Sequence, residues 1–343
     1  MISNSTLFYT KFIPKCNGDC IDVNNCILKH SVVEYNYDIP SNGFTLYDSN
    51  AVNTTVASTY SIWQTSNVFL TIKKSIINDF KFVSLSYMGR ILSSQSNITF
   101  EDSSISNLST GVNLYSYSLF TYARLQFNFA IRRCKFTLGN LVFNNDYASN
   151  EISIIDSVLT KVSLGEPETS YIPYEHPILY MRNVSFLDGN LTFYTRKVDI
   201  AYSNITVTTP FGVGRDSNIY CSSIGRSGLV VQASSVGLIA SSLTITNSTI
   251  KNFGTGIQAV AQGLNKIMIT KNNFYGNSLY NVENKGAYDI NAISNYWGTN
   301  NVGVILNKIY DYWDDINYGD VLYKKYSTKA LPAEAGCPRY IKA

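Results

Sequence analysis

The sequence reads Leu243-Thr-Ile-Thr-Asn-Ser-Thr-Ile250, then Ile267-Met-Ile-Thr-Lys-Asn-Asn-Phe274, then Tyr288-Asp-Ile-Asn-Ala-Ile-Ser-Asn-Tyr296-Trp-Gly298. The first two segments share one phrase: apolar, any, apolar, any, any, small polar, any, apolar. The third segment follows the phrase with one extra residue before its aromatic residue. We call this pattern the coil phrase. Its recurrence is typical of a repeat architecture.

The coil phrase recurs along most of the chain, with 19 to 31 residues between successive central apolar positions. Because strand side chains alternate between two faces, apolar-any-apolar predicts a short strand with one buried face. The polar residues that follow predict a turn, and the last apolar residue returns to the core on the next strand. The twelve central apolar residues are Val23, Leu46, Ile72, Phe100, Ile131, Ile154, Met181, Ile200, Ile219, Ile245, Ile269 and Ile290.

A strand, a turn and a strand that repeat at this interval, without hairpin signals or crossover helices, predict an all-β parallel β-helix of about twelve coils. Equivalent residues of such a stack lie above one another. The small polar position therefore becomes a ladder along the turn, in which each member is satisfied by its neighbours. The predicted ladder contains Ser49, Ser75, Ser103, Cys134, Ser157, Val184, Ser203, Ser222, Ser248 and Asn272.

The pattern divides the chain into four parts. We expect an irregular segment at 1–20, the β-helix at 21–299, a C-terminal cap at 300–326 and a loosely ordered tail at 327–343. The cap has apolar residues at helical spacing over 305–313 and a strand pattern at 321–326. A cap is needed because an open last coil exposes unpaired strand edges. We expect Cys337 to tie the tail to the body and no bridge between Cys26 and Cys134.

The coil phrase, the coil length and the ladder resemble the right-handed parallel β-helix repeats of the pectate-lyase-like superfold. The run Asn295-Tyr-Trp-Gly298 resembles the last coil of extracellular β-helix repeat proteins. The resemblance covers residues 20 to 326 and implies a right-handed, single-stranded coil. It says little about activity, because this superfold includes lyases, hydrolases, esterases, adhesins and structural stalks. The Gly-His-Gly and Arg-Ile-Lys motifs of polygalacturonase-like enzymes are absent from the sequence.

Composition narrows the class of protein. Charged residues make up 15% of the chain and the formal charge is +3, which does not indicate a nucleic-acid partner. No apolar run reaches the roughly 18 residues of a transmembrane helix. The sequence predicts no cofactor and no metal site, and we expect a monomer.

Three features of the sequence bear on the cellular compartment: its first ten residues, its cysteines and its sequons. The first ten residues lack the basic and apolar regions of a secretory signal, so either the protein stays inside the cell or the chain begins after its signal. We expect a secreted or cell-surface glycoprotein, since the sequence combines six cysteines with eight Asn-x-Ser/Thr sequons. The sequons begin at Asn4, Asn53, Asn97, Asn107, Asn183, Asn190, Asn204 and Asn247.

Two outward columns of charged residues supply the candidate catalytic groups. One column reads Lys73, Glu101, Arg132, Ile155, Arg182, and the next reads Lys74, Asp102, Arg133, Asp156, Asn183. Asp102 and Asp156 would lie about 9.6 Å apart at two strand spacings, near the upper limit for an inverting pair of carboxylates. Alternatively, Arg133 between them would serve as the base of a lyase. Alternating charge is also the ordinary way to avoid repulsion on an exposed sheet, and this structural interpretation is favoured.

Two long turns in the middle of the predicted stack are candidate carbohydrate-binding loops, because exposed tyrosines can stack on sugar rings. Their tyrosines are Tyr115, Tyr117, Tyr122, Tyr171 and Tyr174. The alternative is that these aromatic side chains fold back over the stack as a local cap. The sequence thus favours a non-catalytic extracellular protein that binds carbohydrate or a cell-surface partner. A polysaccharide lyase or hydrolase using Glu101, Asp102, Arg132, Arg133 and Asp156, and a purely structural spacer, are the alternatives.

Overall fold

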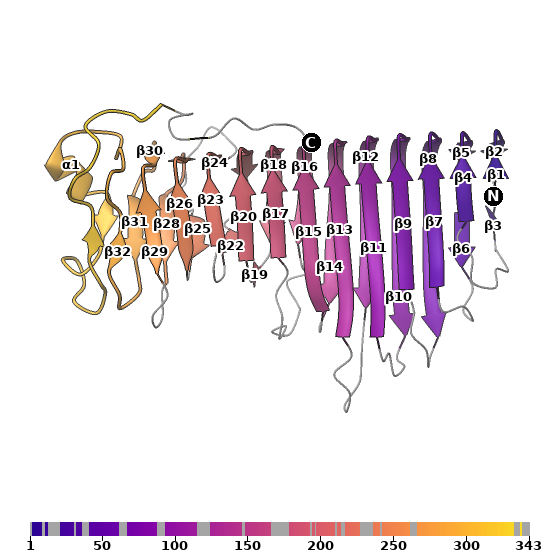
Figure 1. The fold of residues 1–343 in the computed structure, drawn as a ribbon, viewed down its shortest axis with the longest axis horizontal. Coiled ribbons are helices and arrows are strands. Elements are labelled where there is room, and N and C mark those ends of the chain that lie inside the picture. Colours follow the sequence, from indigo (N-terminus) through magenta and orange to yellow (C-terminus); the bar gives the residue numbers. More distant parts are fainter. Residues whose placement is uncertain are drawn as a thin grey trace. The chain divides into compact units, whose positions relative to one another are not determined.

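The computed structural model divides into two compact units, Met1–Pro177 and Ile178–Ala343, which we call the first and second unit. Each unit is built from parallel strands that form the stacked sheets of a right-handed β-helix (Figure 1). The residues that the structure describes are 2–8, 11–12, 21–30, 32–35, 41–61, 67–87, 93–114, 124–145, 148–165, 178–192, 194–195, 197–209, 211–213, 217–226, 236–240, 242–260, 266–332 and 337.

The first unit contains two long sheets, and the chain passes from one to the other at every coil. The first sheet has the order β1 (Ile2–Ser3), β4 (Ile21–Asn24), β7 (Ser41–Tyr47), β9 (Asn67–Lys73), β11 (Ser93–Glu101), β13 (Arg124–Arg132), β15 (Ala148–Ile155). The second sheet has the order β2 (Thr6–Phe8), β5 (Ile27–Lys29), β8 (Asn50–Ser61), β10 (Ile76–Tyr87), β12 (Ser104–Leu114), β14 (Lys135–Asn145), β16 (Val158–Gly165). Beside it, β3 (Lys11–Phe12) pairs with β6 (Val32–Tyr35), which pairs with β8.

The second unit repeats this arrangement and adds a third sheet. Its first sheet has the order β17 (Ile178–Arg182), β20 (Lys197–Ala201), β23 (Ser217–Tyr220), β26 (Leu243–Thr246), β29 (Ile267–Thr270), β32 (Ile290–Asn291), β34 (Val321–Leu322). Its second sheet has the order β18 (Ser185–Thr192), β21 (Asn204–Val207), β24 (Ser223–Arg226), β27 (Thr249–Lys251), β30 (Asn273–Tyr275). Its third sheet has the order β19 (Tyr194–Thr195), β22 (Phe211–Val213), β25 (Val236–Ala240), β28 (Thr255–Ala259), β31 (Tyr280–Asn284), β33 (Ile309–Tyr310).

The fold class predicted from the coil phrase is confirmed. All twelve residues assigned to the central position are buried, from Val23 to Ile290. In the first unit Leu46, Ile72 and Phe100 lie opposite one another on successive strands, and in the second unit Ile200, Ile219 and Ile245 do the same. Each unit by itself has about seven turns in its described residues, where the sequence predicted a single stack of about twelve coils.

The predicted ladder exists as a chain of hydrogen bonds. The backbone N–H of Ser49 donates to Oγ of Ser75 at 3.2 Å, and the N–H of Ser75 donates to Oγ of Ser103 at 3.1 Å. The second unit repeats the pattern at Ser203 and Ser222, with 3.1 Å between donor and acceptor. Each of these hydroxyls also donates to the carbonyl two residues earlier. The small polar side chain thus satisfies backbone groups that the turn removes from the sheets.

A single left-handed residue makes each turn between the first and second sheets. Asp102, Arg133 and Asp156 have φ of 51°, 52° and 50°, and each directly precedes a ladder residue. Asn and Asp tolerate this conformation best, whereas for Arg133 it is uncommon. The turns still pair with each other, because the N–H of Asp102 donates to the Arg132 carbonyl at 3.0 Å. Neighbouring turn side chains are therefore held one strand spacing apart.

The last copy of the coil phrase begins two residues later than predicted. Met268 pairs with Asn291, which places Ala292 rather than Ile290 opposite Ile269. Asn295 then continues the ladder, because its Oδ1 accepts the N–H of Asn272 at 2.8 Å. The corrected copy Ile290-Asn-Ala-Ile-Ser-Asn-Tyr-Trp297 follows the phrase with no extra residue.

Residues 1–20 are not wholly irregular. β1 pairs with β4 through Ile2 and Val23, and β2 pairs with β5 through Thr6 and Ile27. Ser5 stands in the ladder position, directly after the left-handed Asn4. This coil was missed because its phrase lacks the first apolar residue.

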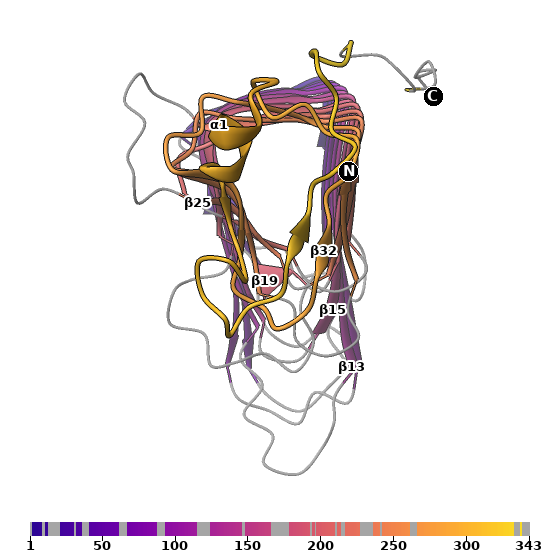
Figure 2. The ribbon, with the colours of Figure 1, turned by 90° about the vertical axis from the view of Figure 1, so that its left-hand side faces the viewer.

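The C-terminal cap is built differently from the prediction. The helix α1 (Val302–Leu306) covers only the first two residues of the segment 305–313, for which helical spacing was predicted. After it, β33 joins the third sheet, with Ile309 paired to Val282. Ile309 is buried by this pairing, so its spacing reflects a strand contact rather than a helix face. Seen along the stack, α1 and β25 lie on the wall opposite β32 (Figure 2). Among the described residues, no helix has the length and apolar character needed to cross a bilayer.

Candidate functional site

The outward charge column of the first unit lies as the sequence predicts. Lys73 pairs with Glu101, Glu101 pairs with Arg132, and Arg132 pairs with Ile155, on strands β9, β11, β13 and β15. Arg182, the last member of the predicted column, ends β17 in the second unit. The candidate residues Asp102, Arg133 and Asp156 occupy the turn positions directly after these strands.

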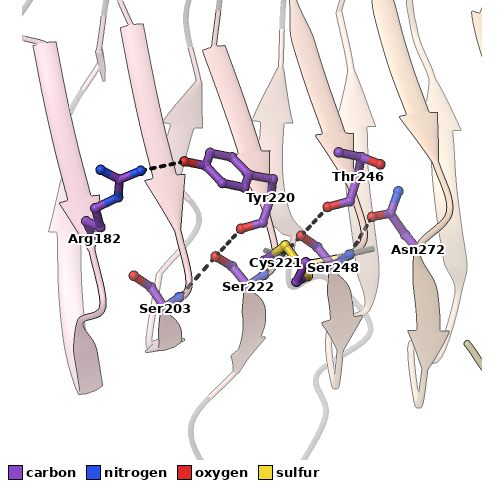
Figure 3. Close-up of a disulfide and its surroundings, with 9 residues drawn as sticks. Arg182, Ser203, Tyr220, Cys221, Ser222, Thr246, Ser248 and Asn272 are labelled. Atoms are coloured by element: carbon purple, nitrogen blue, oxygen red, sulfur yellow. Dashed lines mark hydrogen bonds between the residues drawn. A yellow bond between two sulfur atoms is a disulfide. The ribbon is translucent and has the colours of Figure 1, made fainter. Parts of the chain in front are cut away.

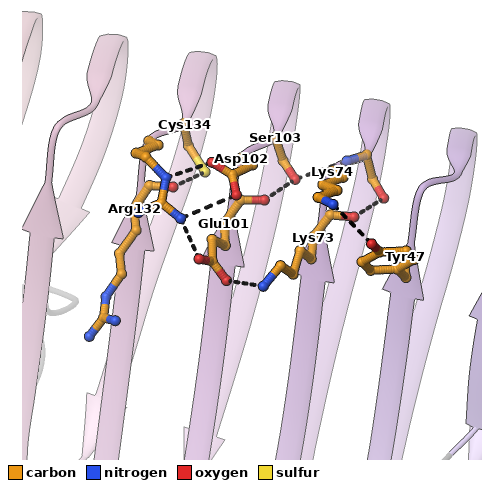
Figure 4. Close-up of polar contacts among 10 residues, drawn as sticks. Tyr47, Lys73, Lys74, Glu101, Asp102, Ser103, Arg132 and Cys134 are labelled. Carbon is orange, nitrogen blue, oxygen red and sulfur yellow. Dashed lines mark hydrogen bonds and ion pairs between the residues drawn. The ribbon is translucent and has the colours of Figure 1, made fainter. Parts of the chain in front are cut away.

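The charged groups form a network that we call the charge ladder (Figure 4). Nζ of Lys73 lies 2.8 Å from Oε2 of Glu101. Arg133 contacts Oε1 of Glu101, and its Nε donates to Oδ1 of Asp102 at 2.6 Å. Nη2 of Arg133, the nitrogen that contacts Glu101, also donates to Oδ2 of Asp102 at 3.2 Å. Arg132 points away from this group of side chains. One arginine therefore bridges two carboxylates, and Lys73 supplies the second positive charge.

The charge ladder keeps both carboxylates ionised. A hydrogen bond from Lys73 holds the pKa of Glu101 below its ordinary value, and Arg133 contributes in the same direction. A hydrogen bond from Arg133 lowers the pKa of Asp102. The same contacts raise the pKa of Arg133. A catalytic acid needs a raised pKa, whereas the pKa values of Glu101 and Asp102 are lowered.

The lowered pKa values predict how stability depends on pH. A carboxylate whose folded pKa lies below its unfolded pKa stabilises the fold above the unfolded value, and this stabilisation is lost as the pH falls through the folded value. We expect Arg133→Gln to lower the melting temperature slightly at pH 7 and to have no effect once Glu101 and Asp102 are protonated, at a pH well below about 4. Thermal melts of both proteins from pH 7 to pH 2 measure this. Equal differences at all pH values would contradict it.

Among the described residues, the cysteines of the ladder do not add to this site. Burial raises the pKa of the Cys134 thiol to about 11, so this ladder cysteine is protonated at neutral pH and is a poor nucleophile. Cys26 and Cys134 are both buried, and their thiols are free. In the part of the chain that the structure describes, no group of three His, Cys, Asp or Glu residues could hold a metal ion. The loop tyrosines lie outside the described residues: Tyr115, Tyr117, Tyr122, Tyr171 and Tyr174.

A groove that the sequence did not predict follows the turns at the start of the first unit. We call it the corner groove, and its volume is about 470 Å³. It is lined by the turn residues Asn25, Asp48 and Lys74, and by Ile27 and Asn50 at the starts of the following strands. The remaining lining residues are Asn4, Ser5, Thr6, Cys26, Ser49 and Ile76. The groove offers both polar groups and exposed apolar side chains.

In the second unit, the chain's own tail (residues 327–332) is attached beside the turns between the first and second sheets. The N–H of Ser327 donates to the Asn295 carbonyl at 2.8 Å, and Asn273 holds the backbone of Leu331. A disulfide joins Cys337 to Cys221, which lies beside the ladder residue Ser222 (Figure 3). The expected tie between Cys337 and the body is thus confirmed. Its partner was not predicted, because the tail does not follow the coil phrase.

Comparisons with known proteins supply no relative from which function can be transferred. No family model, no curated protein and no solved structure matches this chain.

Proposed function

We propose that this protein is a non-catalytic β-helix scaffold of the extracellular space or cell surface, which binds carbohydrate or another surface partner. The observation that carries the proposal is the charge ladder, because Arg133, the candidate base, is bound by the carboxylates of Glu101 and Asp102. Ion pairs of this kind decorate an exposed sheet and fix neighbouring coils in register.

The disulfide supports the extracellular part of the proposal. Disulfides persist in oxidising compartments and are rare where thiols are kept reduced. The bond between Cys221 and Cys337 closes a span of 116 residues within the second unit. The resemblance of Asn295-Tyr-Trp-Gly298 to the last coil of extracellular β-helix repeat proteins, within the pectate-lyase-like superfold, points to the same compartment. The eight sequons make glycosylation part of the proposal.

The alternative function is a polysaccharide lyase or glycoside hydrolase. It is favoured by one observation, namely that Asp102, Arg133 and Asp156 stand on three successive turns of the first unit. Such an enzyme would need one of these groups to exchange a proton near neutral pH. The lowered pKa of Asp102 and the raised pKa of Arg133 oppose this.

Incubation of the purified protein with neutral and anionic polysaccharides separates the two functions. We expect neither new reducing ends nor the ultraviolet absorbance of unsaturated products, and we expect a glycan array to show binding. Asp102→Asn should leave this binding unchanged, whereas Tyr174→Ala should weaken it. Product formation that disappears in Asp102→Asn would establish the enzyme instead, and absence of all binding would leave a structural spacer.

A further inference from the structure

Asn50 and Asn273 occupy the same position of the coil phrase. Asn50 directly follows the ladder residue Ser49 and begins β8, and Asn273 directly follows the ladder residue Asn272 and begins β30. Because the coils repeat, the two amides leave the backbone at equivalent points of the turn. Asn204 is a third asparagine at this position, at the start of β21, and its side chain is exposed.

Asn273 shows what this position can bind. Its Nδ2 donates to the carbonyl of Leu331 at 2.9 Å, and its Oδ1 accepts the N–H of the same residue at 2.9 Å. A carboxamide carries a donor and an acceptor side by side, so it can satisfy both polar groups of one residue's backbone. The contact uses the backbone of the tail and not the Leu331 side chain.

Asn50 has the same amide but no such partner. Its Oδ1 is buried and has no hydrogen-bond partner among the described residues. Buried acceptors are almost always satisfied, and an unsatisfied one destabilises the fold, so an orphan at a groove indicates a missing partner. Asn50 lines the corner groove, in which no segment of the described chain takes the place that the tail takes in the second unit.

We propose that the corner groove binds an extended polypeptide segment, whose backbone Asn50 holds as Asn273 holds the tail. This deepens the proposed function, on which it rests, by naming a site and the class of its surface partner. The soft terminal torsion of asparagine allows the amide to turn towards the incoming chain without moving the strand.

The neighbours of Asn50 fit such a segment. Ile27 and Ile76 pair with Asn50 on the two adjacent strands, and their side chains are 40% and 54% exposed. They offer contacts to apolar side chains on both sides of the captured residue. Asp48 and Lys74 line the groove with one charge of each sign. The partner is therefore an extended peptide with an apolar residue and little net charge, which is captured mainly through its backbone.

The test uses a fluorescent peptide with the sequence of residues 327–332, Ser-Thr-Lys-Ala-Leu-Pro, blocked at both ends. The full chain with its disulfide intact is titrated, so that its own tethered tail occupies Asn273 at high effective concentration. We expect saturable binding, weakened about tenfold by Asn50→Ala because two hydrogen bonds are lost. Asn204→Ala is the matched control and should bind as the unaltered protein does. A peptide with an N-methylated leucine should bind as weakly as Asn50→Ala does.

The outcomes distinguish this site from the proposed function as a whole. Asn50→Ala should melt no lower than the unaltered protein, since the lost amide oxygen has no partner, and this excludes unfolding as the cause of lost binding. Equal peptide affinity of Asn50→Ala and the unaltered protein, or no peptide binding, overturns the inference. Glycan binding together with either result leaves the proposed function intact. Polysaccharide cleavage would overturn the proposed function instead, whatever the peptide does.

Discussion

Asn295→Leu is expected to lower the free energy of unfolding of the second unit by about 3 to 5 kcal/mol. Asn295 is fully buried at the end of the ladder. Its Oδ1 accepts the N–H of Asn272 at 2.8 Å, and its Nδ2 donates to the carbonyls of Ile269 and Ala292 at 2.5 and 2.7 Å. Leucine has a similar volume but leaves three buried backbone groups unsatisfied, and each such group costs about 1 to 3 kcal/mol.

Thermal and denaturant melts followed by circular dichroism measure this loss. Asn300→Leu is the matched control, because Asn300 is exposed five residues further along the same segment. It should change stability by no more than about 0.5 kcal/mol. If both variants melted alike, the ladder would not be holding the last coils together.

The expected loss at Asn295 shows why the fold could be predicted from sequence. The coil phrase encodes two demands at once, a buried apolar face and a small polar group that satisfies the turn. Ile245 and Ser248 meet these demands by residue type alone, so their places could be assigned without coordinates. Where the apolar position and the small polar position both recur in successive coils, they fix which residues of neighbouring strands pair.

The errors occurred where one of the two signals was weak. Tyr288 was taken as the first apolar residue of the last copy, although it is 45% exposed in the structure. Ala292 is too small to stand out as a central residue, yet it is buried there. Aligning Asn295 with Asn272 would have corrected the register, because both asparagines continue the ladder. The first coil, around Ile2 and Ser5, has too few apolar residues to be recognised.

The candidate site was predictable in its positions but not in its contacts. Alternation of side chains placed Glu101 and Arg132 on the outward column, and the turn placed Asp102 beside them. Sequence could not show that Arg133, rather than Arg132, binds both carboxylates, because this depends on the left-handed conformation of its turn. The corner groove was not predictable either, since Asn50 differs from Asn273 only in what lies next to it.

Loss of the disulfide is the second change for which we expect a large effect. Cys337→Ser should reduce the stability of the second unit by about 2 to 4 kcal/mol. The bond joins residues 116 positions apart, so its removal restores much conformational freedom to the unfolded chain. In the folded state it also frees the tail, which is then held mainly by Asn273 at Leu331 and by the Ser327 contact. Stability falls because the unfolded chain gains more conformational freedom than the folded tail does, and amide exchange should accelerate at Leu331.

Melts with and without a thiol reductant isolate the contribution of this bond. Reductant should lower the melting temperature of the unaltered protein to that of Cys337→Ser, and it should leave the variant unchanged. A Cys26→Ser/Cys134→Ser protein is the matched control, because it lacks both buried free thiols but keeps the bond. Serine suits those ladder positions, so the control should fold normally and remain sensitive to reductant. Insensitivity of the unaltered protein to reductant would show that the ladder, and not the tail, sets the stability of the second unit.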